Sequence, residues 1–175
     1  MTANDDILKG KKILVVDDEP DILETLKEIL EECDVETATT FEAAGELLKR
    51  EDYHATILDI MGIRGFDLLK IATEKKIPAL MLTAQGLDPD NLVGSIKLGA
   101  KSYIPKDRMV EIDIYLKEIF IAQEKGIEKS GNWFARLGSF FDKRFGQGWK
   151  NKDKKFWEEF DKTHKVSKDE LEEIM

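Results

Sequence analysis

The chain has 175 residues and a formal net charge of −9 at pH 7, with 42% hydrophobic and 36% charged residues, a balance typical of a folded rather than a disordered protein. No apolar stretch is long enough to span a membrane, no signal-peptide core is visible and the lone Cys33 cannot form an internal disulfide, so we expect a cytoplasmic protein. The acidic balance argues against a broad nucleic-acid-binding surface, and the length fits one domain with a small appendage.

Short apolar runs bounded by turn residues alternate along the chain with segments whose apolar residues recur every three or four positions. The short runs predict buried strands, and the longer spacing predicts helices. We expect strands at Lys12–Val16, Val35–Ala38, Ala55–Ile60, Ala79–Thr83 and Ser102–Ile104, and helices at Asp21–Glu32, Phe41–Arg50, Gly65–Lys75, Asp88–Leu98 and Arg108–Lys125. Five strands alternating with five helices predict an α/β fold with a doubly wound parallel sheet.

Three carboxylates follow two of the predicted strands. Asp17 and Asp18 come directly after the run Ile13–Val16, and Asp59 comes directly after Ala55–Leu58. Open parallel sheets bind their ligands at the carboxyl ends of the strands, so these side chains should lie close together. Carboxylates gathered at one point repel one another unless a cation neutralises them, and Mg²⁺ is a hard cation that prefers oxygen ligands. The sequence therefore predicts a Mg²⁺ site at this sheet edge.

Four stretches, taken in order, resemble a known family, the receiver domain of two-component response regulators. They are Ile13–Glu19 (ILVVDDE), Ile57–Asp59 (ILD), Ala79–Ala84 (ALMLTA) and Leu98–Lys106 (LGAKSYIPK), within a resemblance that covers residues 11–125. The resemblance implies a flavodoxin-like five-stranded sheet of order 2-1-3-4-5 with five helices. It also implies a protein that accepts a phosphoryl group from a histidine kinase or phosphotransfer protein and signals through altered protein–protein contacts. Such a protein is no enzyme beyond self-phosphorylation and self-dephosphorylation.

The resemblance gives each residue of this arrangement a role in phosphoryl transfer. Asp59 would be the phosphoacceptor, and Lys106 would be the fixed cation that balances the charge of the transferred group. Thr83 would hydrogen-bond a phosphoryl oxygen, and Tyr103 would change rotamer with it as the switch. The expected Mg²⁺ ligands are Asp17, Asp18, Asp59 and the backbone carbonyl of Met61. Each residue alone has a plainer structural interpretation, so the prediction rests on their combination.

Two departures from the family pattern affect the expected site. The segment from Asp59 to Gly65 is about two residues shorter than usual. Pro105 precedes Lys106, whereas the family has a proline after the lysine, and a cis peptide bond without proline would cost about 3 kcal/mol, so we expect another backbone path. These departures keep open a pseudo-receiver that binds a partner without phosphorylation. An aspartyl-nucleophile phosphatase of the haloacid dehalogenase type is less favoured, because Met61 stands where that chemistry needs a second aspartate.

The composition changes near Gly126, and we divide the chain there into a receiver domain, residues 1–125, and a helical extension, residues 126–175. The extension contains all three tryptophans, six of the nine phenylalanines, and 11 basic and 10 acidic residues, whereas residues 1–125 carry a net charge of −10. The spacing of its aromatic residues predicts helices over Trp133–Phe145 and Phe156–Phe160, and a capping box predicts a third that begins at Ser167–Glu170.

The sequence leaves several roles open for the extension. Its helices could pack on their own receiver, bridge a homodimer through the fourth and fifth helices, or dock an unknown downstream protein. Binding to a membrane surface is a weaker alternative, suggested by alternating aromatic and basic residues. A DNA-binding output is not supported, because the extension is short and has no basic recognition stripe.

Overall fold

The computed structural model describes residues 6–85, 87–127 and 132–164. Its strands are β1 (Lys12–Val16), β2 (Asp34–Ala38), β3 (Ala55–Leu58), β4 (Ala79–Thr83) and β5 (Ser102–Pro105). The helices that alternate with them are α1 (Pro20–Ile29), α2 (Phe41–Arg50), α3 (Gly65–Glu74), α4 (Pro89–Lys97) and α5 (Ile112–Glu124), with a 3-10 segment, η2 (Lys106–Glu111), before α5. The extension contributes α6 (Asn132–Phe145), a 3-10 segment η3 (Trp149–Asp153) and α7 (Lys154–His164).

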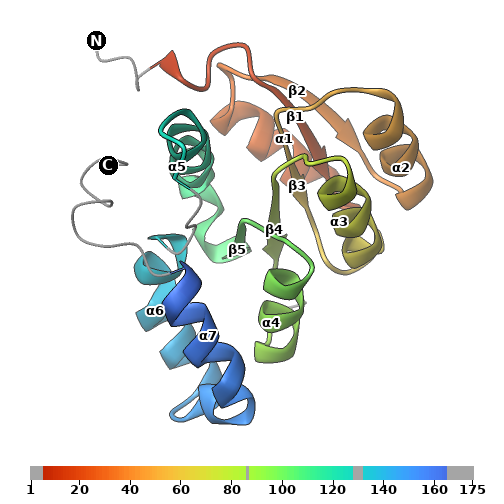
Figure 1. The fold of residues 1–175 in the computed structure, drawn as a ribbon. Coiled ribbons are helices and arrows are strands. Elements are labelled where there is room, and N and C mark those ends of the chain that lie inside the picture. The colour runs from red at the N-terminus through yellow and green to blue at the C-terminus, as the bar shows by residue number, and fades with distance from the viewer. Residues whose placement is uncertain (1–5, 86, 128–131, 165–175) are drawn as a thin grey trace.

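The five strands form one parallel sheet in the order β2-β1-β3-β4-β5, which confirms the predicted fold class. Strands β3, β4 and β5 are buried at every residue, and only β2 at one edge carries an exposed residue. Helices α1 and α5 lie on one side of the sheet and α2 and α3 on the other (Figure 1). Strands covered on both faces are apolar throughout, which is why continuous apolar runs marked them in the sequence.

The register of the parallel pairs decides which side chains meet at the carboxyl edge. Val16 pairs with Leu58, Leu58 pairs with Met81, and Thr83 pairs with Pro105. The ends of β1, β3, β4 and β5 therefore lie side by side. The residues gathered there are Asp17, Asp18, Asp59, Thr83 and Lys106.

The segment after β5 differs from the prediction. A single helix from Arg108 was expected, but the chain forms the 3-10 segment from Lys106 and begins α5 only at Ile112. Arg108 has φ −110° and ψ 17°, outside helical values, so the chain is kinked within this 3-10 segment. Elsewhere the main difference is in α1, which ends at Ile29 rather than Glu32.

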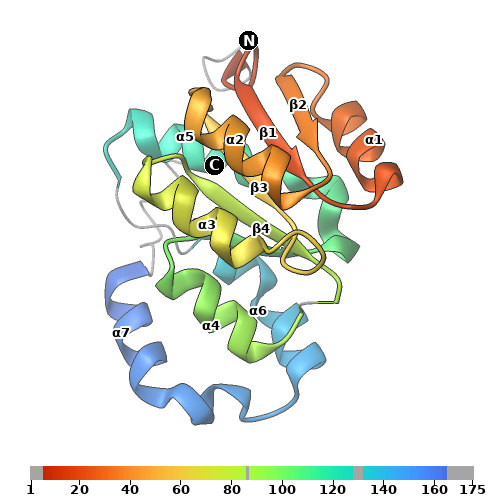
Figure 2. The same ribbon diagram turned by 90° about the vertical axis from the view of Figure 1, so that its right-hand side faces the viewer.

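The extension packs against its own receiver. Helix α6 lies beside the edge strand β5, and α7 lies next to α4 (Figures 1 and 2). Gly146 (φ +89°) and Gly148 (φ +77°) separate α6 from η3. The third predicted helix, at Ser167–Glu170, lies outside the described residues. Because an edge strand offers unpaired backbone groups, covering β5 with a helix also protects the sheet from pairing with another chain.

Most aromatic residues of the extension form one cluster, which we call the aromatic cluster. Neighbouring ring centroids lie 5.0–6.5 Å apart, from 5.0 Å between Phe134 and Trp157 to 6.5 Å between Phe134 and Trp149. The members of the cluster are Trp133, Phe134, Phe141, Phe145, Trp149, Trp157 and Phe160. Phe141 at its centre is fully buried.

None of the described helices is long and apolar enough to cross a membrane.

Candidate functional site

The acidic cluster at the carboxyl edge of the sheet consists of Asp17, Asp18 and Asp59. One carboxylate oxygen from each lies within 4.8 Å of the others. Asp17 and Asp59 are only 2% and 6% exposed, whereas Asp18 faces solvent. The backbone N–H of Asp59 donates to the Val16 carbonyl at 3.0 Å, and that of Asp17 donates to the Ala38 carbonyl at 3.2 Å. The sheet ladder thus continues into the site and holds both buried carboxylates in place.

Lys106 brings the positive charge of the site. Its Nζ lies 2.9 Å from Asp17 Oδ2, 3.0 Å from Glu19 Oε2 and 3.4 Å from Asp59 Oδ2. The lysine follows β5 directly, and the described residues contain no cis peptide bond, so it reaches the carboxylates from a trans backbone. Glu19 was not predicted as a site residue. The signal that could have identified it was its position directly after the aspartate pair.

Burial and mutual repulsion shape the ionisation of the site. Burial raises the pKa of Asp59 to about 6, the charge of Asp17 adds to this rise, and Lys106 opposes it. Burial also raises the pKa of Asp17, again against the hydrogen bond from Lys106. Burial favours a lower pKa for Lys106, but its hydrogen bonds to Asp17 and Glu19 outweigh burial and raise the pKa. The site therefore holds more negative charge than one lysine neutralises.

The loop between Asp59 and α3 is built on two glycines. Gly62 has φ +87°, and a Cβ at this position would overlap the carboxylate of Asp18. A Cβ on Gly65 would overlap the carbonyl oxygen of Asp59. The backbone thus passes so close to the acidic cluster that only glycine fits. The side chain of Met61, in the same loop, is 47% exposed, and the role of its carbonyl as a metal ligand stays a prediction.

The two predicted switch residues lie on neighbouring strands. Thr83 ends β4, is fully buried and pairs with Pro105, the residue before the site lysine. Tyr103 on β5 is also fully buried, and its hydroxyl accepts a hydrogen bond from the N–H of Asp88 at 3.1 Å. The ring of Tyr103 lies 6.1 Å from that of Phe141 in the extension. Tyr103 therefore connects the strand beside the acidic cluster to the aromatic cluster.

The acidic cluster fits a small divalent cation with oxygen ligands. Its three carboxylates come within 4.8 Å of one another, and the exposed Asp18 leaves one side open to water. Mg²⁺ in proteins commonly uses one or two carboxylates and keeps several water ligands. The raised pKa of Asp59, about 6, is the sign of a site in which a further positive charge would be stabilising.

Comparison with known proteins gives a consistent result. The family model described as response regulator receiver domain matches residues 13–116. Response regulator GtcR of Aneurinibacillus migulanus is 31% identical over 141 residues, which are 73% of this chain and 58% of that protein. The transcriptional regulatory protein CpxR homolog of Haemophilus influenzae is 40% identical over 101 residues, 54% of this chain and 43% of that protein. The chain thus spans about half the length of these curated relatives.

Solved structures agree in fold. A CheY-like response regulator receiver domain protein from Methanospirillum hungatei JF-1 has a TM-score of 0.61 and 29% identity, covering 67% of this chain and 99% of that chain. The structure described as the BeF3 activated DrrB receiver domain has a TM-score of 0.55 and 29% identity, covering 64% of this chain and 97% of that chain. Both comparisons leave about one third of the present chain unmatched.

Proposed function

The chain belongs to the response regulator receiver domain family of two-component signalling, as its motifs predicted, and we propose that it accepts a phosphoryl group on Asp59. The donor would be a histidine kinase or a phosphotransfer protein, and Asp17, Asp18 and Asp59 would hold Mg²⁺. The phosphorylated protein would signal through altered protein–protein contacts. Receiver domains mostly act as signalling domains, and we propose no enzymatic activity beyond self-phosphorylation and self-dephosphorylation.

The position of Lys106 is the observation that carries this proposal. Its ammonium group lies 2.9 Å from an oxygen of Asp17 and 3.4 Å from an oxygen of Asp59. A phosphoryl group attached to Asp59 would place its oxygens within reach of this ammonium. Phosphoryl transfer depends on fixed positive charge around those oxygens, and a lysine that is 12% exposed supplies such charge in a site of reduced dielectric.

The proposed step is a displacement at phosphorus. A carboxylate oxygen of Asp59 forms a bond to phosphorus while the bond from phosphorus to the donor's imidazole nitrogen breaks. The bound metal ion would supply positive charge to the phosphoryl oxygens. Asp59 must be ionised to attack, and a pKa of about 6 keeps most of it ionised at neutral pH.

Three further residues take supporting roles in this proposal. Thr83 would donate its hydroxyl to a phosphoryl oxygen, Tyr103 would change rotamer, and the carbonyl of Met61 would complete the Mg²⁺ ligands. Their positions support these roles, because Thr83 ends the strand next to that of Asp59, and Met61 lies in the loop that touches Asp18. We keep the proposed division into a receiver, residues 1–125, and an extension, residues 126–175.

Phosphorylation by a small-molecule donor tests the proposal. The full chain would be incubated with acetyl phosphate and Mg²⁺, and its intact mass measured. We expect a gain of one phosphoryl group in the wild type, and no gain in Asp59→Asn or when a chelator removes Mg²⁺. An unchanged mass of the folded wild type would contradict the phosphoacceptor function.

The metal assignment is tested by a matched pair of neighbouring acids. Asp18→Asn removes a proposed ligand, whereas Glu19→Gln removes a carboxylate that contacts Lys106 but stands outside the acidic cluster. We expect Asp18→Asn to weaken Mg²⁺ binding clearly in calorimetric titrations and Glu19→Gln to change it much less. Equal affinities for the wild type and Asp18→Asn would place the metal elsewhere.

A pseudo-receiver is the second candidate function, and the tight loop after Asp59 is the observation that favours it. Gly62 lies against the Asp18 carboxylate and limits the room for a metal ion and its water. This function predicts normal partner binding by Asp59→Asn. The phosphatase alternative gains no support, because Met61, two residues after Asp59, carries no carboxylate.

A further inference from the structure

Helix α6 occupies the surface formed by α4, β5 and α5, which we call the α4–β5–α5 face. Trp133, Leu137 and Phe141 recur every four residues along α6, so they form one stripe, and each is at most 3% exposed. Phe141 packs on Tyr103 of β5, with ring centroids 6.1 Å apart. Such a stripe in a groove is the common mode by which an amphipathic helix is recognised.

Charged pairs fix α6 and α7 at the two sides of this face. Arg136 of α6 donates from Nε to the buried carboxylate of Glu118 in α5 at 2.6 Å. On the other side, Lys97 of α4 lies over the ring of Phe156 in α7, 5.6 Å from its centroid. The extension therefore contacts all three elements of the α4–β5–α5 face.

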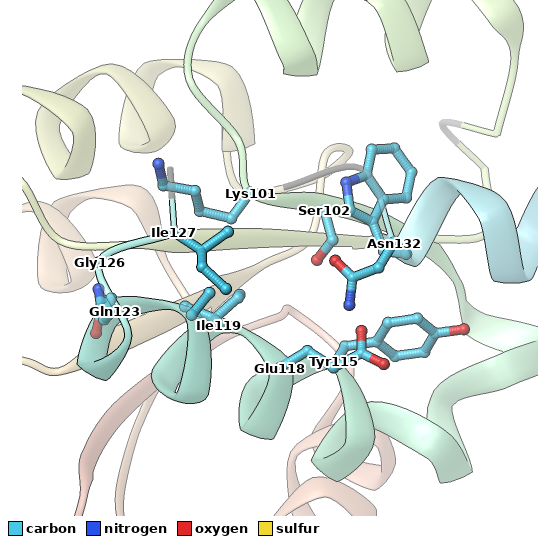
Figure 3. A pocket seen from close by; sticks show the side chains of 11 residues that line it. Lys101, Ser102, Tyr115, Glu118, Ile119, Gln123, Gly126, Ile127 and Asn132 are labelled. Carbon is cyan, nitrogen blue, oxygen red and sulfur yellow. The ribbon is translucent and has the colours of Figure 1, made fainter. Parts of the chain in front are cut away.

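The packing of the start of α6 against α5 and β5 is nevertheless incomplete. A cavity of about 600 Å³ lies between β5, α5 and the start of α6, and Figure 3 shows Ser102 and Asn132 on its wall. Ser102 Oγ and Asn132 Nδ2 are buried beside this cavity, and Tyr115 Oη is buried nearby; none of the three has a hydrogen-bond partner within the described part of the chain. If α6 left this surface, these polar groups could form hydrogen bonds to water. Burial of the aromatic cluster therefore favours docking of α6, whereas the lost hydration of the polar groups disfavours it.

One short segment joins the acidic cluster to the extension. It begins at Lys106, whose ammonium binds Asp17 and Asp59, and two residues later Arg108 lies over the ring of Phe140 in α6, 5.7 Å from its centroid. The same segment continues from β5, which carries Tyr103 against α6. A displacement of Lys106 could therefore be transmitted to α6 through its contacts with Arg108 of η2 and Tyr103 of β5.

Lys106 and a metal ion compete for the same oxygen. The Lys106 ammonium lies 2.9 Å from Asp17 Oδ2, in the cluster that fits a cation. Metal and phosphoryl binding would take Lys106 from Asp17 to the phosphoryl oxygens. The contacts of Arg108 and Tyr103 with α6 are seen in the arrangement in which Lys106 binds Asp17, so a change of partner by Lys106 would act on the segment that carries them.

We propose that the α4–β5–α5 face is a docking groove whose occupant is the chain's own α6, and that occupation of the acidic cluster releases α6 through Lys106 and η2. The proposal rests on the proposed function of Asp59. By linkage, docked α6 in turn lowers the affinity of the acidic cluster for a phosphoryl group or its analogue.

The tryptophans give a direct readout, because all three lie in the extension and none in residues 1–125. The full-length protein would be titrated with beryllofluoride and Mg²⁺. Fluorine NMR would report occupation of Asp59, and acrylamide quenching of tryptophan emission would report exposure of the extension. We expect quenching to rise in step with occupation. Unchanged or lower quenching at full occupation would overturn the release of α6 and leave the proposed function standing.

A matched pair of variants tests the route. Phe140 and Phe156 are both half-buried phenylalanines of the extension that lie under a cation, Arg108 of η2 and Lys97 of α4 respectively. We expect Phe140→Ala to tighten beryllofluoride binding about fivefold, at the lower end of typical coupling, and Phe156→Ala to leave it within about twofold. Equal effects of the two variants would overturn the route through η2.

A final arm works without the phosphoryl analogue. Lys106→Gln removes the ion pairs to Asp17 and Asp59, and Lys106→Arg keeps a positive charge. With no reagent added, we expect tryptophan quenching above the wild-type value in Lys106→Gln and near it in Lys106→Arg. If beryllofluoride does not bind, the proposed function is contradicted. The comparison of the Lys106 variants then remains as the test of the docking proposal. Equal quenching in the wild type and a folded Lys106→Gln would overturn it.

Discussion

The surroundings of Asp59 in the folded protein disfavour its ionised form. It is 6% exposed, lies beside Asp17, and has a pKa of about 6 against an ordinary value of 3.8, even with Lys106 next to it. Structural carboxylates usually have partners that lower the pKa instead. A buried acid with a raised pKa in an open acidic cluster is typical of a functional site, at which a bound cation completes the charge balance.

Asp59→Asn should stabilise the protein in the absence of Mg²⁺. The pKa rise from 3.8 to about 6 corresponds to a cost of about 1–3 kcal/mol at neutral pH. Between these values the native state binds more protons than the unfolded state, so this group adds stability as the pH falls from about 6 to about 4. The advantage of Asp59→Asn should therefore be largest above about pH 7 and shrink in acid.

Urea unfolding at about pH 7.5 and about pH 5 would measure this difference. Asp52→Asn is the control, because its side chain is fully exposed, and we expect no such pH-dependent gain. A lower stability of Asp59→Asn than of the wild type at neutral pH would show that Lys106 already balances the charge of the site.

Gly62→Ala should damage both stability and metal binding. Gly62 and Gly10 have φ values of +87° and +74°, but a Cβ on Gly62 would overlap Asp18, whereas Gly10 faces open space. Both alanine variants should lose about 1 kcal/mol for the left-handed backbone. Only Gly62→Ala should lose more stability than this and bind Mg²⁺ more weakly. Urea unfolding would measure the stability, and calorimetric titration would measure the Mg²⁺ affinity. Equal losses in the two variants would mean that the loop moves away from Asp18 without cost.

At the scale of elements, the helices of the extension are held by a buried ion pair as well as by aromatic rings. Glu118 on α5 is 6% exposed, and Arg136 on α6 reaches it at 2.6 Å. Burial raises the pKa of Glu118, and Arg136 opposes the rise. Neither residue was singled out from the sequence, since both stand on helix faces that read as polar, and only the packing of α6 on α5 brings them together.

Arg136→Met should destabilise the docked extension. The substitution leaves the Glu118 carboxylate buried without its partner. We expect the free energy of unfolding to fall by about 1–3 kcal/mol at pH 7, less than for a fully buried pair, because the Arg136 side chain is 31% exposed. The loss should shrink as the pH falls and Glu118 takes up a proton. Arg144→Met, at an exposed position of the same helix, is the control. Thermal unfolding followed by tryptophan emission would test this, and equal midpoints would contradict the role of the pair.

Local patterns predicted most elements because local chemistry decides them. Thr40 caps α2 and Asp88 caps α4, each by accepting a hydrogen bond from a backbone N–H, and the helices begin at or within one residue of the predicted Phe41 and Asp88. The predicted start of α5 was wrong because residues 106–111 form a kinked 3-10 segment, in which Lys106 reaches the acidic cluster, and the local sequence does not show this tertiary contact. The helices of the extension followed from aromatic spacing, and packing on its own receiver was one of the roles that the sequence left open.

The same distinction applies to the site. Strand ends predicted that Asp17, Asp18 and Asp59 would meet, because parallel strands share one carboxyl edge. The ion pair between Lys106 and Glu19 and the contact of Gly62 with Asp18 join residues from different loops. No spacing rule relates such residues, so only the folded chain shows them.

In the whole molecule, the extension covers the α4–β5–α5 face. Of the roles left open by the sequence, packing on its own receiver is the one seen in this chain. A homodimer through α4 and α5 would compete with α6 for this face. Assembly of two chains would then require that α6 leaves first.

Deleting residues 127–175 tests this arrangement. The shortened chain should remain folded and still accept a phosphoryl group, because the sheet and the acidic cluster lie within residues 12–106. It should self-associate, since removing α6 uncovers Tyr103 and its apolar neighbours. Sedimentation velocity of the two chains would measure this, with circular dichroism as the control for folding. If the shortened chain were monomeric like the full chain, the uncovered face would not drive self-association.

The central claim is that Asp59 becomes an acyl phosphate. After incubation with acetyl phosphate and Mg²⁺, borohydride would reduce the acyl phosphate to homoserine, and peptide mass spectrometry would locate the reduced residue. We expect homoserine at position 59 alone, with none in samples lacking Mg²⁺. Homoserine at Asp17 or Asp18, or at no aspartate of a folded and metal-loaded protein, would contradict it.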